Sequence, residues 1–258
     1  MILWIESQGT ITIAALVFAL NYAVAAAIFV ATRLVAQRRI AVDLKATTPV
    51  MLTPLSVLTG LLIAFLASHV WSNIDRAHTY IAQEGSALRD VVMLADELPP
   101  EVGNAVRGGV KTYLRFIETE DWPAMAKSGA SWQQSPPGLT DAMRSLLAFV
   151  PHGPGEQVAQ QGAIASVERA VAARRGRIVL SRAVIAPIEW IVIMVLAALA
   201  LLTIAMVHID RRVTAAINLA VFATAVAACL VLLMVNDRPF AAGGVTLDPG
   251  VLREIAVS

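Results

Sequence analysis

Four long stretches of the chain are apolar and free of Asp, Glu, Lys and Arg. They cover residues 7–32, 46–74, 190–209 and 213–236. A helix needs about 20 apolar residues to cross the hydrocarbon core of a bilayer. Because lipid offers no partner to a free backbone amide, a crossing segment must be helical. The pattern therefore predicts an all-α membrane protein with four transmembrane helices.

Polar segments divide the four helices into two hairpins. Short basic linkers follow the first and third helices, at 33–48 and 208–212, and a long polar stretch separates the two pairs. We expect a helical extramembrane domain to be inserted between the second and third helices. The expected segments are 1–48 (first helix and basic linker), 49–71 (second helix), 72–181 (helical domain), 182–209 (third helix), 213–236 (fourth helix) and 237–258 (tail).

The inserted stretch predicts several helices separated by proline-rich breaks. Two segments show apolar residues at steps of three or four, which is typical of amphipathic helices. They are Val102, Val106, Val110, Tyr113 and Ile117, and then Leu139, Met143, Leu146, Leu147 and Val150, the second with Thr140 as a possible cap.

A heptad pattern follows the second transmembrane segment. Its two rows are Ile74, Ile81, Leu88 and Ala95, and Ala77, Glu84, Val91 and Leu98. Such rows are the a and d positions of a helix packing along one face. One long helix is therefore predicted to run from the membrane to Leu98. This heptad seam fits either an intramolecular core or a contact between subunits.

Glu84 occupies a d position of the heptad seam, so its carboxylate points into a packed face. A buried carboxylate needs a partner. The segment that returns to the membrane carries Arg174, Arg175 and Arg177 at a similar height along the helix. We predict an ion pair between Glu84 and one of these arginines, with Arg174 or Arg177 favoured. The alternative is a Glu84 that meets only water at the edge of the seam.

The composition is typical of a membrane protein and argues against a soluble domain or a nucleic-acid-binding protein. Hydrophobic residues make up 57% of the chain and charged residues 15%, against about 25% in soluble domains. The net charge of +1 gives no field that would attract nucleic acid, and no such partner is predicted. The single cysteine, Cys229, cannot form an internal disulfide.

The motifs for chemistry are weak. The run Gly108-Gly109-Val110-Lys111-Thr112 lacks the ending of a phosphate loop, and the four histidines lack metal-ligand spacing. We predict no enzyme activity, no metal site and no cofactor. Four polar residues in or beside the spans, Asn21, His69, Glu189 and Asn218, could line an ion path or simply bond neighbouring groups. The basic cluster Arg174, Arg175, Arg177 and Arg182 is interpreted as an anchor for lipid headgroups.

Several short motifs, in order, resemble the bacterial bestrophin-like family of membrane proteins. They are Gly60 to Phe65 with Trp71, Gln83 to Leu88, Leu98-Pro99, Tyr113, Asp121-Trp122-Pro123-Ala124-Met125, Arg174-Arg175-Gly176-Arg177, Pro187 with Trp190, and Asp237-Arg238-Pro239-Phe240 with Pro249. The resemblance covers roughly residues 49–253. Asp121 stands where the family usually has Glu, and Asn236 where it usually has an apolar residue.

The resemblance, with its remote similarity to bestrophin anion channels, implies an oligomeric ion channel in a bacterial inner membrane. It implies a pentamer whose pore is lined by the second helix and conducts anions. On that helix Leu58, Leu62, Phe65 and His69 share one face, which either lines the pore or simply meets lipid or another helix. Asp237 and Arg238 join Glu84 and the arginines as candidates for ion pairs. The alternative is a membrane-anchored interaction or regulatory protein without transport activity.

Charge in the short linkers predicts the orientation. They hold Arg33, Arg38, Arg39, Lys45, Arg211 and Arg212. Short loops rich in Lys and Arg mark the cytoplasmic side. The helical domain is therefore expected outside the cytoplasm, although the Arg174 to Arg182 cluster and the cytosolic domain of bestrophins argue for the reverse.

Overall fold

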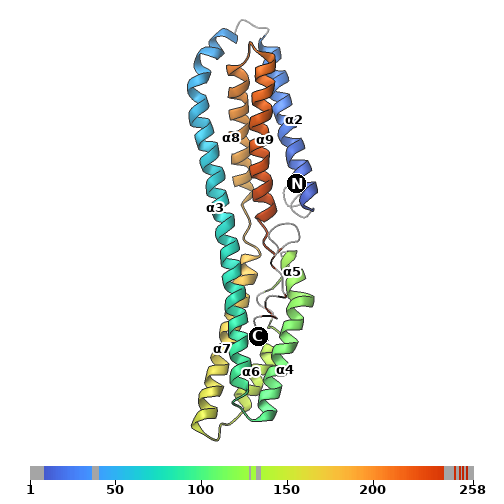
Figure 1. Cartoon of the computed structure of the whole chain (residues 1–258), viewed down its shortest axis with the longest axis vertical. Helices are drawn as coiled ribbons and strands as arrows, with labels where there is room; N and C mark the ends of the chain where they lie inside the picture. The colour runs from blue at the N-terminus through green and yellow to red at the C-terminus, as the bar shows by residue number, and fades with distance from the viewer. Residues whose placement is uncertain are drawn as a thin grey trace. The chain divides into compact units, whose positions relative to one another are not determined.

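The structure, a computed structural model, describes residues 9–36, 41–127, 129–131 and 135–240, with 247, 250, 252 and 254; side chains are not described for 35–36 and 41–49. All the regular elements in these ranges are helices (Figure 1). They are α2 (Thr10–Ala36), α3 (Ala41–Ala95), α4 (Pro100–Phe116), the π-helical turn η1 (Ile117–Asp121), α5 (Trp122–Ala126), α6 (Leu139–Ala148), α7 (Pro154–Leu180), α8 (Pro187–Val207) and α9 (Arg212–Asn236).

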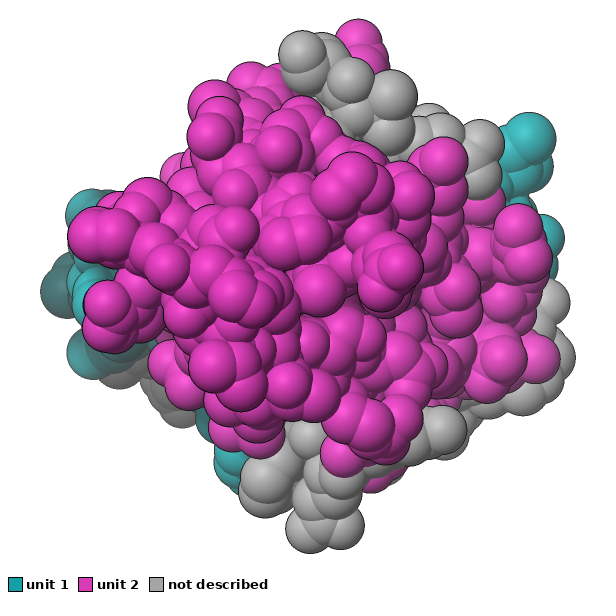
Figure 2. Space-filling view, turned by 90° about the horizontal axis from the view of Figure 1, so that it is seen from below, with its two compact units in different colours: residues 1–71, 184–237, 243–245 teal, residues 72–183, 238–242, 246–258 magenta. Residues whose placement is uncertain are grey.

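The chain divides into two compact units, coloured separately in Figure 2. Unit 1 lies within residues 1–71, 184–237 and 243–245. Unit 2 lies within residues 72–183, 238–242 and 246–258.

The predicted transmembrane helices are present. Four helical segments are long and apolar enough to cross a membrane: Thr10–Leu34, Val50–Ala95, Pro187–Val207 and Arg212–Asn236. The third begins at Pro187. Proline is favoured in the first turn of a helix, because the amide it lacks would be unpaired there anyway.

Three of these helices form the packed part of unit 1. α2, α8 and α9 lie side by side (Figure 1), around a small core that includes Ala25, Leu201 and Ala223. Hydrogen bonds join them at two heights. The hydroxyl groups of Tyr22 and Thr224 are 2.7 Å apart, and Arg33 Nη1 donates to the carbonyl of Ile209 at 2.6 Å.

The part of α3 that belongs to unit 1 is the most exposed of the four candidate spans. Phe65 is 74% exposed and Val50 is 72% exposed. Buried side chains such as Leu66 and Val70 are the exceptions. An apolar helix face left open in a single chain needs lipid or another protein to cover it.

The core of unit 2 forms along the heptad seam. Every residue of the two rows, from Ile74 to Leu98, is buried within the single chain. The residues from Ala77 onward pack against α4, α6 and α7. This burial favours the interpretation of the seam as an intramolecular core.

Some local predictions were wrong. α3 ends at Ala95 and not at Leu98, because a residue before proline disfavours the helical conformation. Leu147, in the last turn of α6, and Val150, beyond the end of α6 at Ala148, are both exposed. The N-cap of α6 is Gly138, with φ +81°, and Thr140 instead donates to the carbonyl of Pro136.

Candidate functional site

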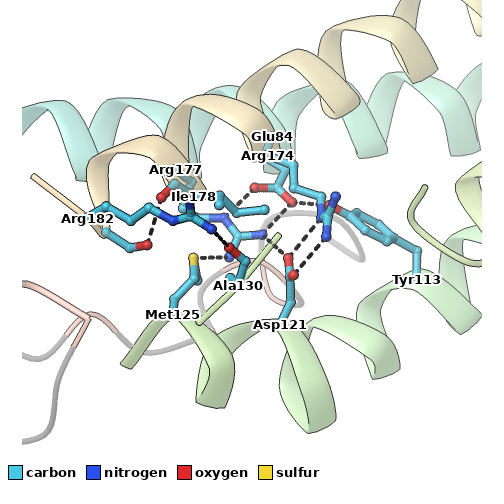
Figure 3. Close-up of polar contacts among 10 residues, drawn as sticks. Glu84, Tyr113, Asp121, Met125, Ala130, Arg174, Arg177, Ile178 and Arg182 are labelled. Atoms are coloured by element: carbon cyan, nitrogen blue, oxygen red, sulfur yellow. Dashed lines mark hydrogen bonds and ion pairs between the residues drawn. The ribbon is translucent and has the colours of Figure 1, made fainter. Parts of the chain in front are cut away.

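A cluster of five polar side chains lies inside unit 2 (Figure 3). Glu84 comes from α3, Tyr113 from α4, Asp121 from the end of η1, and Arg174 and Arg177 from α7. Each side chain is at most 3% exposed. Two guanidinium groups face two carboxylates, so the cluster carries no net charge when all four groups are ionised.

Arg177 is the centre of the cluster. Its Nε donates to Glu84 Oε2 at 2.8 Å, and its Nη2 donates to Glu84 Oε1 at 3.0 Å. The same Nη2 lies 3.4 Å from Asp121 Oδ2, and Nη1 lies 3.4 Å from Met125 Sδ. Glu84 thus contacts one of the two arginines favoured from the sequence. The planar fork of arginine suits such two-point contact with a carboxylate.

Arg174 makes the second two-point contact, with Asp121. Its Nε donates to Oδ2 at 2.9 Å and its Nη2 donates to Oδ1 at 2.8 Å. Burying one ion without its partner would cost several kcal/mol. Here each carboxylate receives donors on both oxygens, which offsets the loss of water.

Tyr113 completes the cluster. Its hydroxyl donates to Glu84 Oε1 at 2.5 Å. Burial, and the negative charge of Glu84, raise the pKa of Tyr113 well above its usual value. Burial alone would lower the pKa of Arg177, but the nearby Glu84, Tyr113 and Asp121 raise it overall. Tyr113 therefore stays neutral and Arg177 stays charged.

A π-helical turn ends at Asp121. α4 runs into η1, and Asp121 is the last residue of η1 before Trp122-Pro123 begins α5. A π-helical turn holds an extra residue relative to an α-helix, which changes the direction of the side chains that follow. Such turns are frequent at functional sites, and here the turn accompanies the burial of Asp121.

Aromatic rings cover the guanidinium groups. The Arg177 guanidinium lies 5.1 Å from the centre of the Trp122 ring, and that of Arg174 lies 5.7 Å from the Phe116 ring. The Trp122 ring in turn meets Phe240 edge to face at 5.4 Å. The two contacts between an arginine and a ring are of the cation–π kind, and the rings cover the ion pairs.

Chemically, the cluster is a clamp. Its charges are matched, and it joins α3, α4, η1 and α7 through side chains alone. The anchor interpretation of the basic cluster is wrong for Arg174 and Arg177, because both are buried against carboxylates. Arg175 is exposed and takes no part in the clamp, while Arg182 donates to the carbonyl of Ala130.

Three further sequence-predicted residues are described by their own surroundings. Asp237 is buried in unit 1 and accepts from the backbone N–H of Ile185 at 3.0 and 3.2 Å. Arg238 is half-buried in unit 2. Glu189 accepts from the N–H of Ala186 at the start of α8.

The remaining polar residues of the spans all belong to unit 1. Asn21 is buried and donates to the carbonyl of Val17. Asn218 contacts the Nε2 of His208 at 3.1 Å. His69 is exposed on α3, as are Leu58 and Phe65, and Leu62 is half-buried. The proposed pore face is therefore open in the single chain.

Two members of the clamp were not assigned a partner from the sequence. Asp121 entered only as part of a motif shared with a family, and Tyr113 entered through such a motif and as one position of an amphipathic helix. The available signal was the acidic residue beside Trp122-Pro123, which ends an amphipathic pattern. The π-helical turn that accompanies its burial leaves no periodic trace.

These features define a class: an all-helical, multi-pass membrane protein with a buried ion clamp. A family model described as a bestrophin-like domain matches residues 19–249. The chain belongs to the bestrophin-like family. No curated protein and no solved structure matches it.

Proposed function

We propose that this protein is an oligomeric ion channel that conducts anions through a pore lined by α3. Membership of the bestrophin-like family supports channel function. The observation that carries the proposal is the exposed apolar face of α3 in unit 1, which a single chain leaves uncovered.

The proposed pore face consists of Leu58, Leu62, Phe65 and His69. These positions are spaced by three or four residues, so they share one side of the helix. Leu58 is 51% exposed and Phe65 is 74% exposed. A narrow ring of such side chains gates ion flow by expelling water. His69 supplies a polar group at one end of this apolar run.

A ring of identical chains covers this face in the proposed assembly. Most homo-oligomers have closed cyclic symmetry, and the family resemblance favours a pentamer. In such a ring α3 of each chain faces the central axis, while α2, α8 and α9 face lipid. The host membrane is proposed to be a bacterial inner membrane.

We propose that unit 2 is the extramembrane domain, inserted between two transmembrane hairpins. Its helices expose charged side chains, including Glu101, Lys111, Arg115 and Glu168, which favour water over lipid. The basic linkers lie at the ends of the spans away from this domain, and basic linkers favour the cytoplasmic side. In the proposed orientation the domain therefore lies outside the cytoplasm. The ion clamp then keeps α3 and α7 in register where they leave the membrane.

Planar-bilayer recording on the purified protein tests the channel. Wild-type protein is expected to carry current, and a chloride gradient is expected to shift the reversal potential towards that of chloride. Phe65→Ala is expected to increase conductance or open probability by widening the constriction. Val57→Ala is a matched control, because Val57 is also exposed but lies about 100° around the helix from Leu58.

Absence of ion flux over a range of pH, Ca²⁺ and voltage would contradict the channel. It would instead favour a membrane-anchored protein whose helical domain binds a partner. Equal effects of Phe65→Ala and Val57→Ala would contradict the assignment of the pore face.

A further inference from the structure

The proposed pore face is the first part of a longer exposed face of α3. Its four residues, from Leu58 to His69, follow one another at alternating steps of four and three, the spacing of a and d positions in a heptad. α3 is one helix from Ala41 to Ala95, so these two rows continue beyond His69 (Figure 1). The next positions are Ser72, Arg76, Thr79, Gln83 and Ser86, and each of them is exposed. We call the face from Leu58 to Ser86 the second heptad face.

The second heptad face changes from apolar to polar along the helix. Leu58, Leu62 and Phe65 are apolar, and every position from His69 onward is polar. Polar side chains at successive a and d positions are costly in a dry seam, where each buried polar group needs a partner. The buried heptad seam of α3 holds a single polar residue, Glu84, and that residue is paired. The polar part of the second heptad face therefore suits contact with water.

Arg76 carries the permanent charge of this face. A guanidinium group stays protonated at any ordinary pH, and no other residue of the second heptad face is Arg, Lys, Asp or Glu. Arg76 is exposed and forms no hydrogen bond or ion pair with the described part of the chain. Asp75 lies about 100° away around the helix, since each residue of an α-helix advances by that angle. The charge of Arg76 is thus not neutralised on its own face.

Beyond Arg76 the second heptad face borders an open groove of unit 2. Gln83 and Ser86 line this groove, of about 580 Å³, together with Arg169 of α7. The volume is far larger than the roughly 30 Å³ that one water molecule occupies in the liquid. Arg169 Nη2 lies 3.0 Å from Asp90 Oδ2, so the charge of Arg169 is matched. The groove gives hydrated ions room beside α3.

A ring of chains would gather the Arg76 side chains. In a closed cyclic assembly, equivalent residues lie at the same height around the axis. Arg76 is seven residues beyond His69, or about 10 Å along a helix. Its guanidinium groups would then form a ring of positive charge beyond the apolar constriction. Rings of Arg or Lys are a common basis of anion selectivity in pores, because fixed charge concentrates ions of the opposite sign.

We propose that Arg76 makes the pore selective for anions: its guanidinium groups attract small anions and repel cations where α3 enters unit 2. This inference rests on the proposed channel and names the group that chooses its ion. The apolar constriction from Leu58 to Phe65 carries no charge, so it does not by itself distinguish an anion from a cation. The selecting group must therefore lie elsewhere along the conducting path.

Reversal potentials in planar bilayers, under a gradient of NaCl, test Arg76. Wild type is expected to favour chloride over sodium. Arg76→Gln is expected to lower this permeability ratio by about tenfold, as the loss of a charged ring predicts, and Arg76→Glu is expected to favour sodium. Arg76→Lys keeps the charge and is expected to stay selective for chloride. Arg115→Gln is the matched control, because Arg115 is exposed on α4, a helix that packs against the buried seam of α3.

Chemical restoration of the charge tests the same position in channels that are already assembled. In a Cys229→Ala background, Arg76→Cys removes the guanidinium group and supplies the one thiol of the chain. A cationic methanethiosulfonate reagent is expected to restore selectivity for chloride, and an anionic reagent is expected to favour sodium. Arg115→Cys in the same background is expected to keep the selectivity of wild type with either reagent.

The outcomes separate this inference from the channel itself. A chloride-selective current that neither Arg76→Gln nor modification of Arg76→Cys alters would overturn the role of Arg76 and leave the channel standing. Equal shifts in Arg76→Gln and Arg115→Gln would also overturn it, since the effect would then come from the overall charge of unit 2. Absence of current from wild type would overturn the channel, and this inference with it.

Discussion

Arg177 holds both carboxylate oxygens of Glu84, with Nε and Nη2 at 2.8 and 3.0 Å from them. The two residues are 93 positions apart in the chain, and neither side chain is exposed. The contact joins the start of the inserted segment to its end. Because both ions are desolvated, each stabilises the fold only while the other is present.

Glu84→Ala is therefore expected to destabilise unit 2 strongly. Removing one member of a buried ion pair costs about 3–5 kcal/mol, because the other charge is left unpaired. Glu84→Gln is expected to cost less, since the amide oxygen still accepts from Arg177. The free energy of unfolding in detergent, followed by tryptophan fluorescence, measures both changes.

A double-mutant cycle with Arg177→Ala isolates the pair. Residues in direct contact show coupling of about 0.5–3 kcal/mol, and we expect a value near the upper end. Glu168→Ala is the control: this acid is exposed on α7, and its loss should change stability by no more than about 0.5 kcal/mol. Additive effects of the Glu84 and Arg177 variants would contradict the ion pair that joins α3 and α7.

Tyr113 makes the fold sensitive to alkali. In the unfolded chain its pKa is near 10.0, and in the folded protein burial and Glu84 raise that pKa. Above pH 10 the unfolded state loses the proton that the folded state keeps, so unfolding becomes more favourable. The stabilising contribution is complete below pH 10 and is lost as the pH rises towards the folded pKa.

Melting temperature measured from about pH 8 to about pH 11 tests this linkage. Wild type is expected to lose stability more steeply at the alkaline end than Tyr113→Phe, which has no proton to release. Tyr80→Phe provides the comparison within unit 2. Tyrosinate absorbance from Tyr113 is expected to appear together with unfolding, and its appearance in the folded protein would contradict the assignment.

The fold was readable from the sequence where its pattern is periodic. The four apolar stretches and the heptad seam each repeat a simple spacing, so the candidate spans and the buried face of α3 followed directly. Ends of elements were less predictable. Leu147 and Val150 continue an amphipathic pattern in the sequence, yet they fall at or beyond the last turn of α6 and are exposed.

The clamp was only half predictable. The ion pair of Glu84 was predictable, because a carboxylate at a heptad d position needs a partner. The sequence gives no such signal for Asp121, since this residue ends a π-helical turn whose extra residue breaks the spacing that would have assigned it to a face. The contact between Arg174 and Asp121 depends on that turn, and no periodic signal in the chain encodes it.

Gly176 of α7 leaves room for the ring of Tyr80 from α3. A Cβ at this position would lie 2.5 Å from Tyr80 Cε1, a distance that requires movement. Gly176→Ala is expected to destabilise the protein by about 1–3 kcal/mol through overpacking. Gly108→Ala on α4 is the matched control, because a Cβ there meets nothing within 4 Å. It is expected to stabilise α4 by up to about 1 kcal/mol, as alanine favours helix over glycine.

The melting temperature is expected to fall in Gly176→Ala and to rise in Gly108→Ala. Tyr80→Ala combined with Gly176→Ala is expected to recover part of the loss by removing the ring that the new methyl group meets. A Gly176→Ala protein as stable as wild type would show that the Tyr80 ring moves aside at little cost, and it would contradict the predicted overpacking.

Orientation in the membrane is the last prediction. The segments 33–48 and 208–212 include the turns between the spans and the adjoining helix ends. Together they carry six basic residues: Arg33, Arg38, Arg39, Lys45, Arg211 and Arg212. Such residues are retained on the cytoplasmic side. Unit 2 is then expected on the outer side.

In a Cys229→Ala background, Thr119→Cys in unit 2 is expected to react with a membrane-impermeant maleimide on intact spheroplasts. Asp210→Cys, in the linker between α8 and α9, is expected to react only after lysis; both positions are exposed, so accessibility of the thiol is matched. The reverse labelling pattern would place unit 2 in the cytoplasm, and the basic residues of the linkers would then lie on the side where translocation normally disfavours them.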